Sequence, residues 1–269
     1  MQHYKINIMK LKKYFLIAIL TLIGFNSQAQ IKNMDDFIVK TEELRMLTQR
    51  VAKNYIMNGI LPNNPKIVKQ LKEDSDTFNE TLVNLTDSAL NEEIEIELQK
   101  LNLSWMLLNR ILQKKYDTNA AAKVVKYADK MSKEIEIIAD MVNNQTKLKS
   151  VKLLRLSSNG RMLSQKLLLY YIAAKAKVRD ANIPVEFKKT KEDLYEVIKV
   201  LTNQSENDPD LKTDSGILMY VDMIKDGYDK VRKNITLDSK VHPKTANMIV
   251  NQMTDNFELL TEILYEKFN

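Results

Sequence analysis

The chain has 269 residues, of which 44% are hydrophobic, and a formal net charge of +6. It contains no cysteine, which excludes disulfides, thiolate metal sites and cysteine nucleophiles. With only five glycines and five prolines it favours long helices joined by short connections.

The positive charge is concentrated at the N-terminus. Residues 1–30 hold four lysines and no acidic residue, which leaves a formal charge of +2 for the rest of the chain. Nucleic-acid binding requires a concentrated basic face, and a nearly neutral remainder does not supply one. We therefore expect no nucleic-acid partner.

The same N-terminal segment has the anatomy of a secretory signal peptide. Lys10, Lys12 and Lys13 precede about 12 apolar residues from Tyr14 to Phe25, and small residues follow at Ser27 and Ala29. The sequence predicts a signal peptide over 1–29 that is cleaved before Gln30, and hence a periplasmic or secreted protein. The alternative is an uncleaved anchor in the inner membrane, although the apolar run is short for a span of about 20 residues.

After the leader, apolar residues recur every three to four positions and no alternating strand pattern occurs, which predicts an all-α protein. The five prolines fall between the periodic segments, where helices must stop. The predicted helices cover residues 32–58, 64–86, 90–115, 120–142, 147–180, 185–204, 212–235 and 243–267.

An internal repeat divides this series of helices into two halves. Residues 44–56 read LRMLTQRVAKNYI and residues 160–172 read GRMLSQKLLLYYI, at a constant offset of 116 residues. The repeat predicts a duplication, with one up-and-down four-helix bundle over 30–145 and a second over 146–269.

The connection between the halves determines how the two predicted bundles are arranged relative to each other. Residues 120–180 contain no proline and one glycine, which favours a long central helix shared by two bundles stacked end to end. Arg45 and Arg161 would then lie roughly 40 Å apart, so that a site built from paired arginines would need a homodimer. Asn143 and Asn144 favour a turn instead, which would place the bundles side by side with both arginines at equal height.

The repeated motif places charge on an otherwise apolar helix flank. Arg45 lies one turn before Gln49, and Arg161 one turn before Gln165. A guanidinium in such a place needs a partner, and its planar fork suits a carboxylate or another oxyanion. One interpretation is half of a site for a small anion or polar solute, with Arg45, Gln49, Arg161 and Gln165 as ligand-binding residues. The other is a structural arginine that pairs with an acidic residue of the bundle.

The two copies, RMLTQR and RMLSQK, resemble the signature of the PilJ-type domain, the sensing region of type IV pilus chemotaxis transducers, which is related to the sensor domain of the NarX and NarQ nitrate/nitrite histidine kinases. The resemblance implies a periplasmic four-helix bundle in each half. It also implies that Arg45 and Arg161 bind an anion such as nitrate or nitrite where two bundles meet. The nitrate sensors have glycine three residues before this arginine, whereas this chain has Glu42 and Ser158. Glu42 is placed to pair with Arg45 and to weaken its attraction for an anion.

The sequence contains few residues suited to catalysis. The two histidines, His3 and His242, lie in the leader and beside a proline, and the glycines are too scattered for a phosphate-binding loop. We expect a non-enzymatic sensor-like binding protein without metal or cofactor, since no signalling region follows the second copy. The alternative is a structural or interaction module that docks an envelope partner protein.

Overall fold

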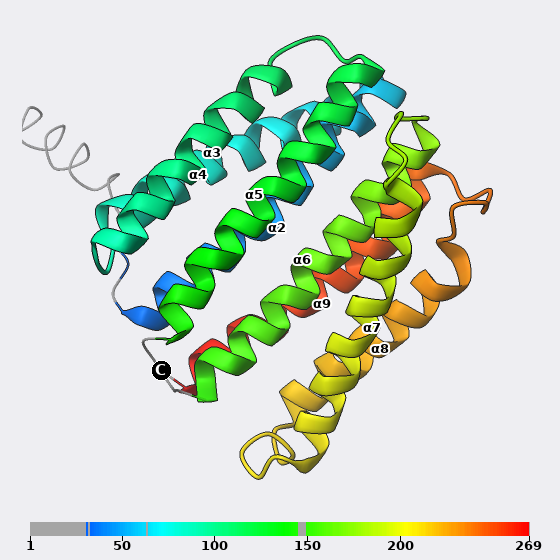
Figure 1. Cartoon of the computed structure of the whole chain (residues 1–269). Helices are drawn as coiled ribbons and strands as arrows, with labels where there is room; N and C mark the ends of the chain where they lie inside the picture. The colour runs from blue at the N-terminus through cyan, green and yellow to red at the C-terminus, as the bar shows by residue number, and fades with distance from the viewer. Residues whose placement is uncertain (1–30, 32, 63, 145–148, 269) are drawn as a thin grey trace, which may run out of the picture. The chain divides into compact units, whose positions relative to one another are not determined.

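The computed structural model describes residues 31, 33–62, 64–144 and 149–268, so the predicted signal peptide lies outside the described residues. Within these ranges the chain forms eight α-helices and no strand (Figure 1). The helices are α2 (Met34–Ile60), α3 (Pro65–Asp87), α4 (Glu92–Leu112), α5 (Thr118–Asn144), α6 (Lys149–Lys175), α7 (Ile183–Asn207), α8 (Ser215–Asn234) and α9 (Pro243–Phe268). The prediction of an all-helical protein is confirmed.

The helix ends follow the capping signals in the sequence. The side chains of Asn33, Asn91 and Asp214 accept backbone hydrogen bonds at the starts of α2, α4 and α8. The largest difference from the predicted bounds is at α6, which ends at Lys175 rather than near 180. There Lys177 adopts a positive φ of 55°, and Val178 donates a backbone hydrogen bond to Ala173, which is the Schellman arrangement that stops a helix.

The helices pack in two groups of four. In the first group α2 lies against α3 and α5, and α4 lies against α3 and α5. In the second group α6 lies against α7 and α9, and α8 lies against α7 and α9. Figure 1 shows α3 and α4 on one outer side and α7 and α8 on the other, with α2, α5, α6 and α9 between them.

The two helices that carry the repeated motif pack directly along each other. Their contacts run in the same order along both helices: Glu42 with Arg155, Arg45 with Asn159, and Lys53 with Gln165. The helices α2 and α6 are therefore parallel neighbours. The connection over 145–148 lies outside the described residues.

This packing corrects the prediction of an end-to-end stack with a shared central helix. Helices of two stacked bundles cannot touch along their length, yet α2 and α6 do. The physical reason lies in α2, which buries residues on nearly all its faces and so needs a second partner beyond its own group. The premise of the predicted homodimer, two motif helices held far apart in stacked bundles, is not met. The homodimer itself stays a prediction.

Aromatic residues help to fill the interior. Trp105 is 1% exposed and its ring lies 4.1 Å, centroid to centroid, from that of Phe78. Tyr55 and Tyr171, at equivalent positions of the repeat, are both buried. These side chains are part of the packed core.

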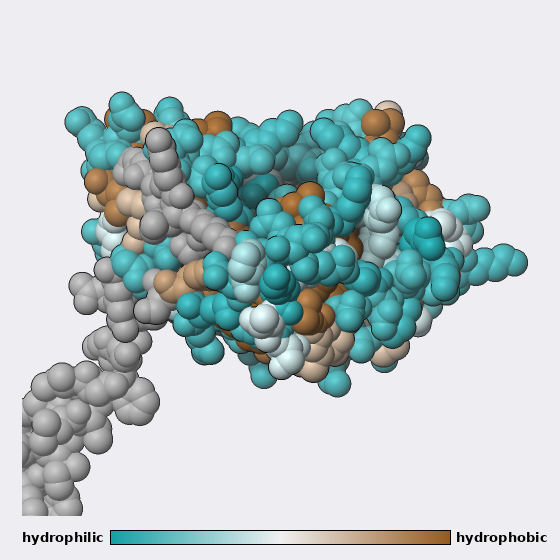
Figure 2. Space-filling view, turned by 90° about the horizontal axis from the view of Figure 1, so that it is seen from below, coloured by the Kyte–Doolittle hydropathy of each residue, from teal (hydrophilic) through white to brown (hydrophobic). Residues whose placement is uncertain are grey.

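Seen from below, the described surface is mostly hydrophilic, with apolar residues in separate patches (Figure 2). None of the helices that the structure describes combines the length and the apolar character that crossing a membrane requires.

Candidate functional site

The parallel packing of α2 and α6 produces two related pockets, one beside each motif arginine. The pocket beside Arg161 is lined from α2 by Asp36, Val39, Lys40 and Glu43. The pocket beside Arg45 is lined from α6 by Lys152, Arg155, Leu156 and Asn159. These two sets occupy the same four positions of the repeat, again offset by 116 residues. Each arginine therefore faces the equivalent surface of the other motif helix.

In the first pocket Arg45 is neutralised by acidic residues of its own chain. Its side chain is nearly fully buried, with Nη1 2.8 Å from Glu42 Oε2 and Nη2 3.6 Å from Glu136 Oε1. Burial acts to lower the pKa of Arg45, but attraction to Glu42 and Glu136 outweighs it and raises the pKa above its ordinary value. The predicted pairing of Glu42 with Arg45 is confirmed.

Glu42 also links the two groups of helices. It is fully buried, and its Oε1 atom lies 3.5 Å from Nε of Arg155 on α6. Arg155 in turn pairs with Asp140 of α5 at 2.7 Å. The arginines of the first pocket are thus paired with carboxylates of the same chain, which fits the structural interpretation of Arg45.

The second arginine lacks such a partner. Arg161 is 5% exposed, and its one ion pair among the described residues is with half-exposed Glu258 at 3.4 Å. Its Nε and Nη2 atoms are buried without a hydrogen-bond partner in the described part of the chain. Ser158 stands where the first copy has Glu42, and its buried hydroxyl also has no partner there. A buried guanidinium that is only partly paired is costly, so an additional anionic group would stabilise this position.

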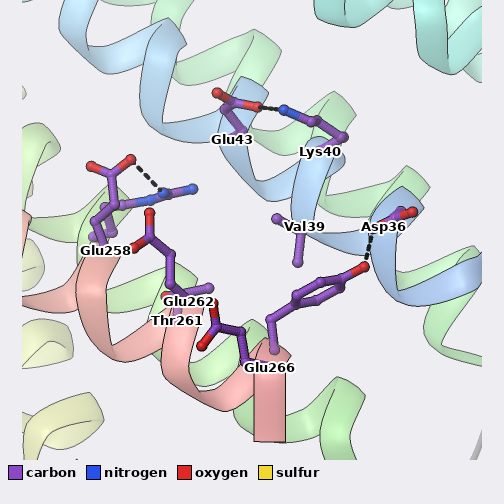
Figure 3. A pocket seen from close by; sticks show the side chains of 10 residues that line it. Asp36, Val39, Lys40, Glu43, Glu258, Thr261, Glu262 and Glu266 are labelled. Carbon is purple, nitrogen blue, oxygen red and sulfur yellow. Dashed lines mark hydrogen bonds and ion pairs between the residues drawn. The ribbon is translucent and has the colours of Figure 1, made fainter. Parts of the chain in front are cut away.

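The pocket in front of Arg161 is large enough to hold a small molecule that carries such a group. It has a volume of about 370 Å³ and lies between α2, α6 and α9. This volume is within the usual range for small-molecule sites, and corresponds to roughly a dozen water molecules. Figure 3 shows Glu258, Thr261, Glu262 and Glu266 on α9, opposite Asp36, Val39, Lys40 and Glu43 on α2.

A glycine next to the motif arginine lets α9 approach. A Cβ atom added at Gly160 would lie 2.2 Å from the ring of Phe257, so only glycine leaves room for this side chain. Phe257 directly precedes Glu258, the residue that contacts Arg161. The first copy has Leu44 at the position of Gly160, and the close approach is a feature of the second copy.

The two motif glutamines lie in the helix packing and outside the lining of both pockets. Gln49 donates from Nε2 to the backbone carbonyl of Ala128 at 3.3 Å. Gln165 donates to Asn251 at 3.0 Å and to Thr254 at 2.9 Å. Of the four predicted site residues, the structure therefore places the two arginines at pockets and gives the two glutamines bundle contacts.

Lys53 is a buried charged residue that sequence reasoning missed. It is fully buried, and its Nζ atom donates to Asn247 at 3.0 Å and to Gln165 at 3.3 Å. Burial, together with the nearby charge of Arg50, lowers the pKa of Lys53 to about 7. The one sign in the sequence that this position is buried was the repeat, where the equivalent residue is the apolar Leu169.

No protein-family model, curated protein or solved structure matches this chain. The resemblance to the PilJ-type domain therefore stays a prediction. Among the residues that the structure describes, no three histidine or acidic side chains converge as a metal site would require.

Proposed function

We propose that the chain is a binding protein that holds a small polar solute in the pocket beside Arg161, with an oxyanion of the solute paired to the guanidinium. One observation carries this proposal: a nearly buried arginine lines a pocket of about 370 Å³, and two of its nitrogens have no hydrogen-bond partner among the described residues. A carboxylate in the pocket would pair with the guanidinium once its two unpaired nitrogens, which are buried in the structure, turn toward the pocket.

The chain is, in this proposal, a duplicated four-helix sensor module of the PilJ type, with the two copies side by side. The repeat, the two groups of four helices and the matched pockets all support a duplication. The copies then diverged. Glu42 turned the Arg45 pocket into a structural ion cluster, whereas Ser158 left Arg161 available to a ligand.

We further propose that the protein acts outside the cytoplasm and is not an enzyme. The predicted signal peptide over 1–29 supports export. The described pocket lining consists of acidic residues, two basic residues, one valine, one threonine and one tyrosine, which suits recognition of a polar solute.

A thermal-shift screen of the full-length protein tests the proposal. The panel contains nitrate, nitrite, small carboxylates and amino acids, each measured with the wild type and with Arg161→Gln. We expect at least one compound to raise the Tm of the wild type by a few degrees and to leave the variant unchanged. A shift that survives in Arg161→Gln, or no shift in the wild type, contradicts the proposal.

A docking module is the second candidate. An apolar stripe on α4 supports it, since Leu103 is 64% exposed and Met106 and Leu107 are exposed beside it. This candidate predicts that a partner protein protects the stripe while no compound in the screen shifts the Tm.

A further inference from the structure

We infer that the solute bound beside Arg161 is a zwitterion, with an ammonium or similar cationic group in addition to its carboxylate. The inference rests on the proposed function and names the class of ligand. It follows from the distribution of charge around the pocket.

The pocket is strongly acidic apart from its one arginine and one lysine. Five carboxylates line it: Asp36, Glu43, Glu258, Glu262 and Glu266. Against the two basic residues, Lys40 and Arg161, this is a formal excess of three negative charges. A simple anion would satisfy Arg161 but would also meet this excess, which repels it.

The five carboxylates differ in how they are already engaged. Glu43 pairs with Lys40 at 2.8 Å, Tyr265 donates a hydrogen bond to Asp36, and Glu258 reaches Arg161. Glu262 and Glu266, on successive turns of α9, form no ion pair with another described residue. These two side chains are the ones available to a cationic group of the ligand.

The pocket beside Arg45 serves as an internal comparison. It holds three basic residues, Arg45, Lys152 and Arg155, and two acidic ones, Glu42 and Glu136. Its formal balance is thus slightly positive, the opposite of the second pocket. Since the two pockets occupy equivalent places, their helix packing does not require the acidic lining beside Arg161, and this lining fits a ligand with a cationic group.

The size of the pocket agrees with such a ligand. A four-atom anion at Arg161 would fill only a small part of about 370 Å³. A molecule that extends from the buried guanidinium toward the acidic face of α9 uses the remaining space and meets both charges.

Calorimetric titration of the full-length protein tests the inference. The probes are the protein amino acids and the linear ω-amino acids from glycine to 6-aminohexanoate, each paired with the fatty acid and the alkylamine that lack one of its two charged groups. We expect a zwitterion to bind about tenfold or more tightly than its carboxylate-only analogue. Arg161→Gln should abolish its binding, and Glu262→Gln should weaken it about fivefold or more while leaving the fatty acid unaffected. Glu192→Gln, on the exposed surface of α7, is the matched control.

The outcomes separate the inference from the proposed function. If nitrate or a carboxylate binds through Arg161 and no zwitterion binds more tightly, the inference is overturned and the proposed function stands. If no probe binds, or if binding is indifferent to Arg161→Gln, both are overturned.

Discussion

Replacing Glu42 with glutamine is expected to lower the free energy of unfolding by about 3 kcal/mol, because it removes the charge that compensates buried Arg45 and nearby Arg155. Glutamine keeps the shape of the side chain, so the loss reports charge rather than packing. Denaturant unfolding of the full-length protein, followed by circular dichroism, measures the change.

The equivalent position of the second copy provides the control. Ser158→Ala removes a buried hydroxyl that has no partner among the described residues, and is expected to change the unfolding free energy by less than about 1 kcal/mol. Equal losses in the two variants would contradict the distinction drawn between a structural and an available arginine.

Replacing Lys53 with leucine is expected to stabilise the protein at pH 7. The fully buried ammonium has a pKa of about 7 against an ordinary value of 10.5. The poor solvation of this charged group therefore lowers the free energy of unfolding of the wild type at neutral pH. Leu169 at the equivalent position shows that the repeat accommodates leucine here. We expect a gain of about 2 kcal/mol, after allowing for the hydrogen bonds lost by Asn247 and Gln165.

The pH dependence distinguishes this cause from a simple packing gain. Below pH 7 both folded and unfolded chains hold the proton of Lys53, and the penalty is fully present. As pH rises from about 7 toward 10.5, the folded chain releases the proton first, so wild-type stability rises relative to the variant. The difference between Lys53→Leu and wild type should shrink by about 2 kcal/mol from pH 7 to pH 9. A difference that is constant over this range would contradict the account.

The helices and the internal repeat could be recognised in the sequence because both depend on local patterns. Apolar periodicity and the positions of proline located all eight described helices, and the motif spacing identified Arg45 and Arg161 as equivalent. The i,i+3 spacing also sufficed to pair Glu42 with Arg45. These features need no knowledge of which helices become neighbours.

What the sequence did not reveal depends on contacts between distant segments. The pocket beside Arg161 combines residues 36–43 of α2 with residues 258–266 of α9, which meet only once α2 packs along α6. The acidic character of the pocket could therefore not be predicted, because Glu258, Glu262 and Glu266 have the pattern of an ordinary solvated helix face. The burial of Lys53 was hidden for the same reason, because α6 and α9 cover it.

Under the proposed function, the residue three positions before each arginine distinguishes a structural from a ligand-binding arginine. A buried carboxylate one turn before Arg45 completes its ion pair inside the chain, whereas a serine at that place leaves Arg161 incomplete. Sites that bind ligands often keep such locally unfavourable groups, and the rest of the fold compensates for them.

Calorimetric titration of Ser158→Glu tests the central claim most directly, because this substitution gives the second copy the carboxylate of the first. The titrant is the compound that binds wild type most tightly in the screen, and helical content and cooperative unfolding confirm that the variant folds. We expect the new glutamate to pair with Arg161 and to weaken binding by about tenfold or more, with Arg161→Gln giving the same loss. Binding by folded Ser158→Glu with the affinity of wild type would contradict the claim that Arg161 holds the ligand.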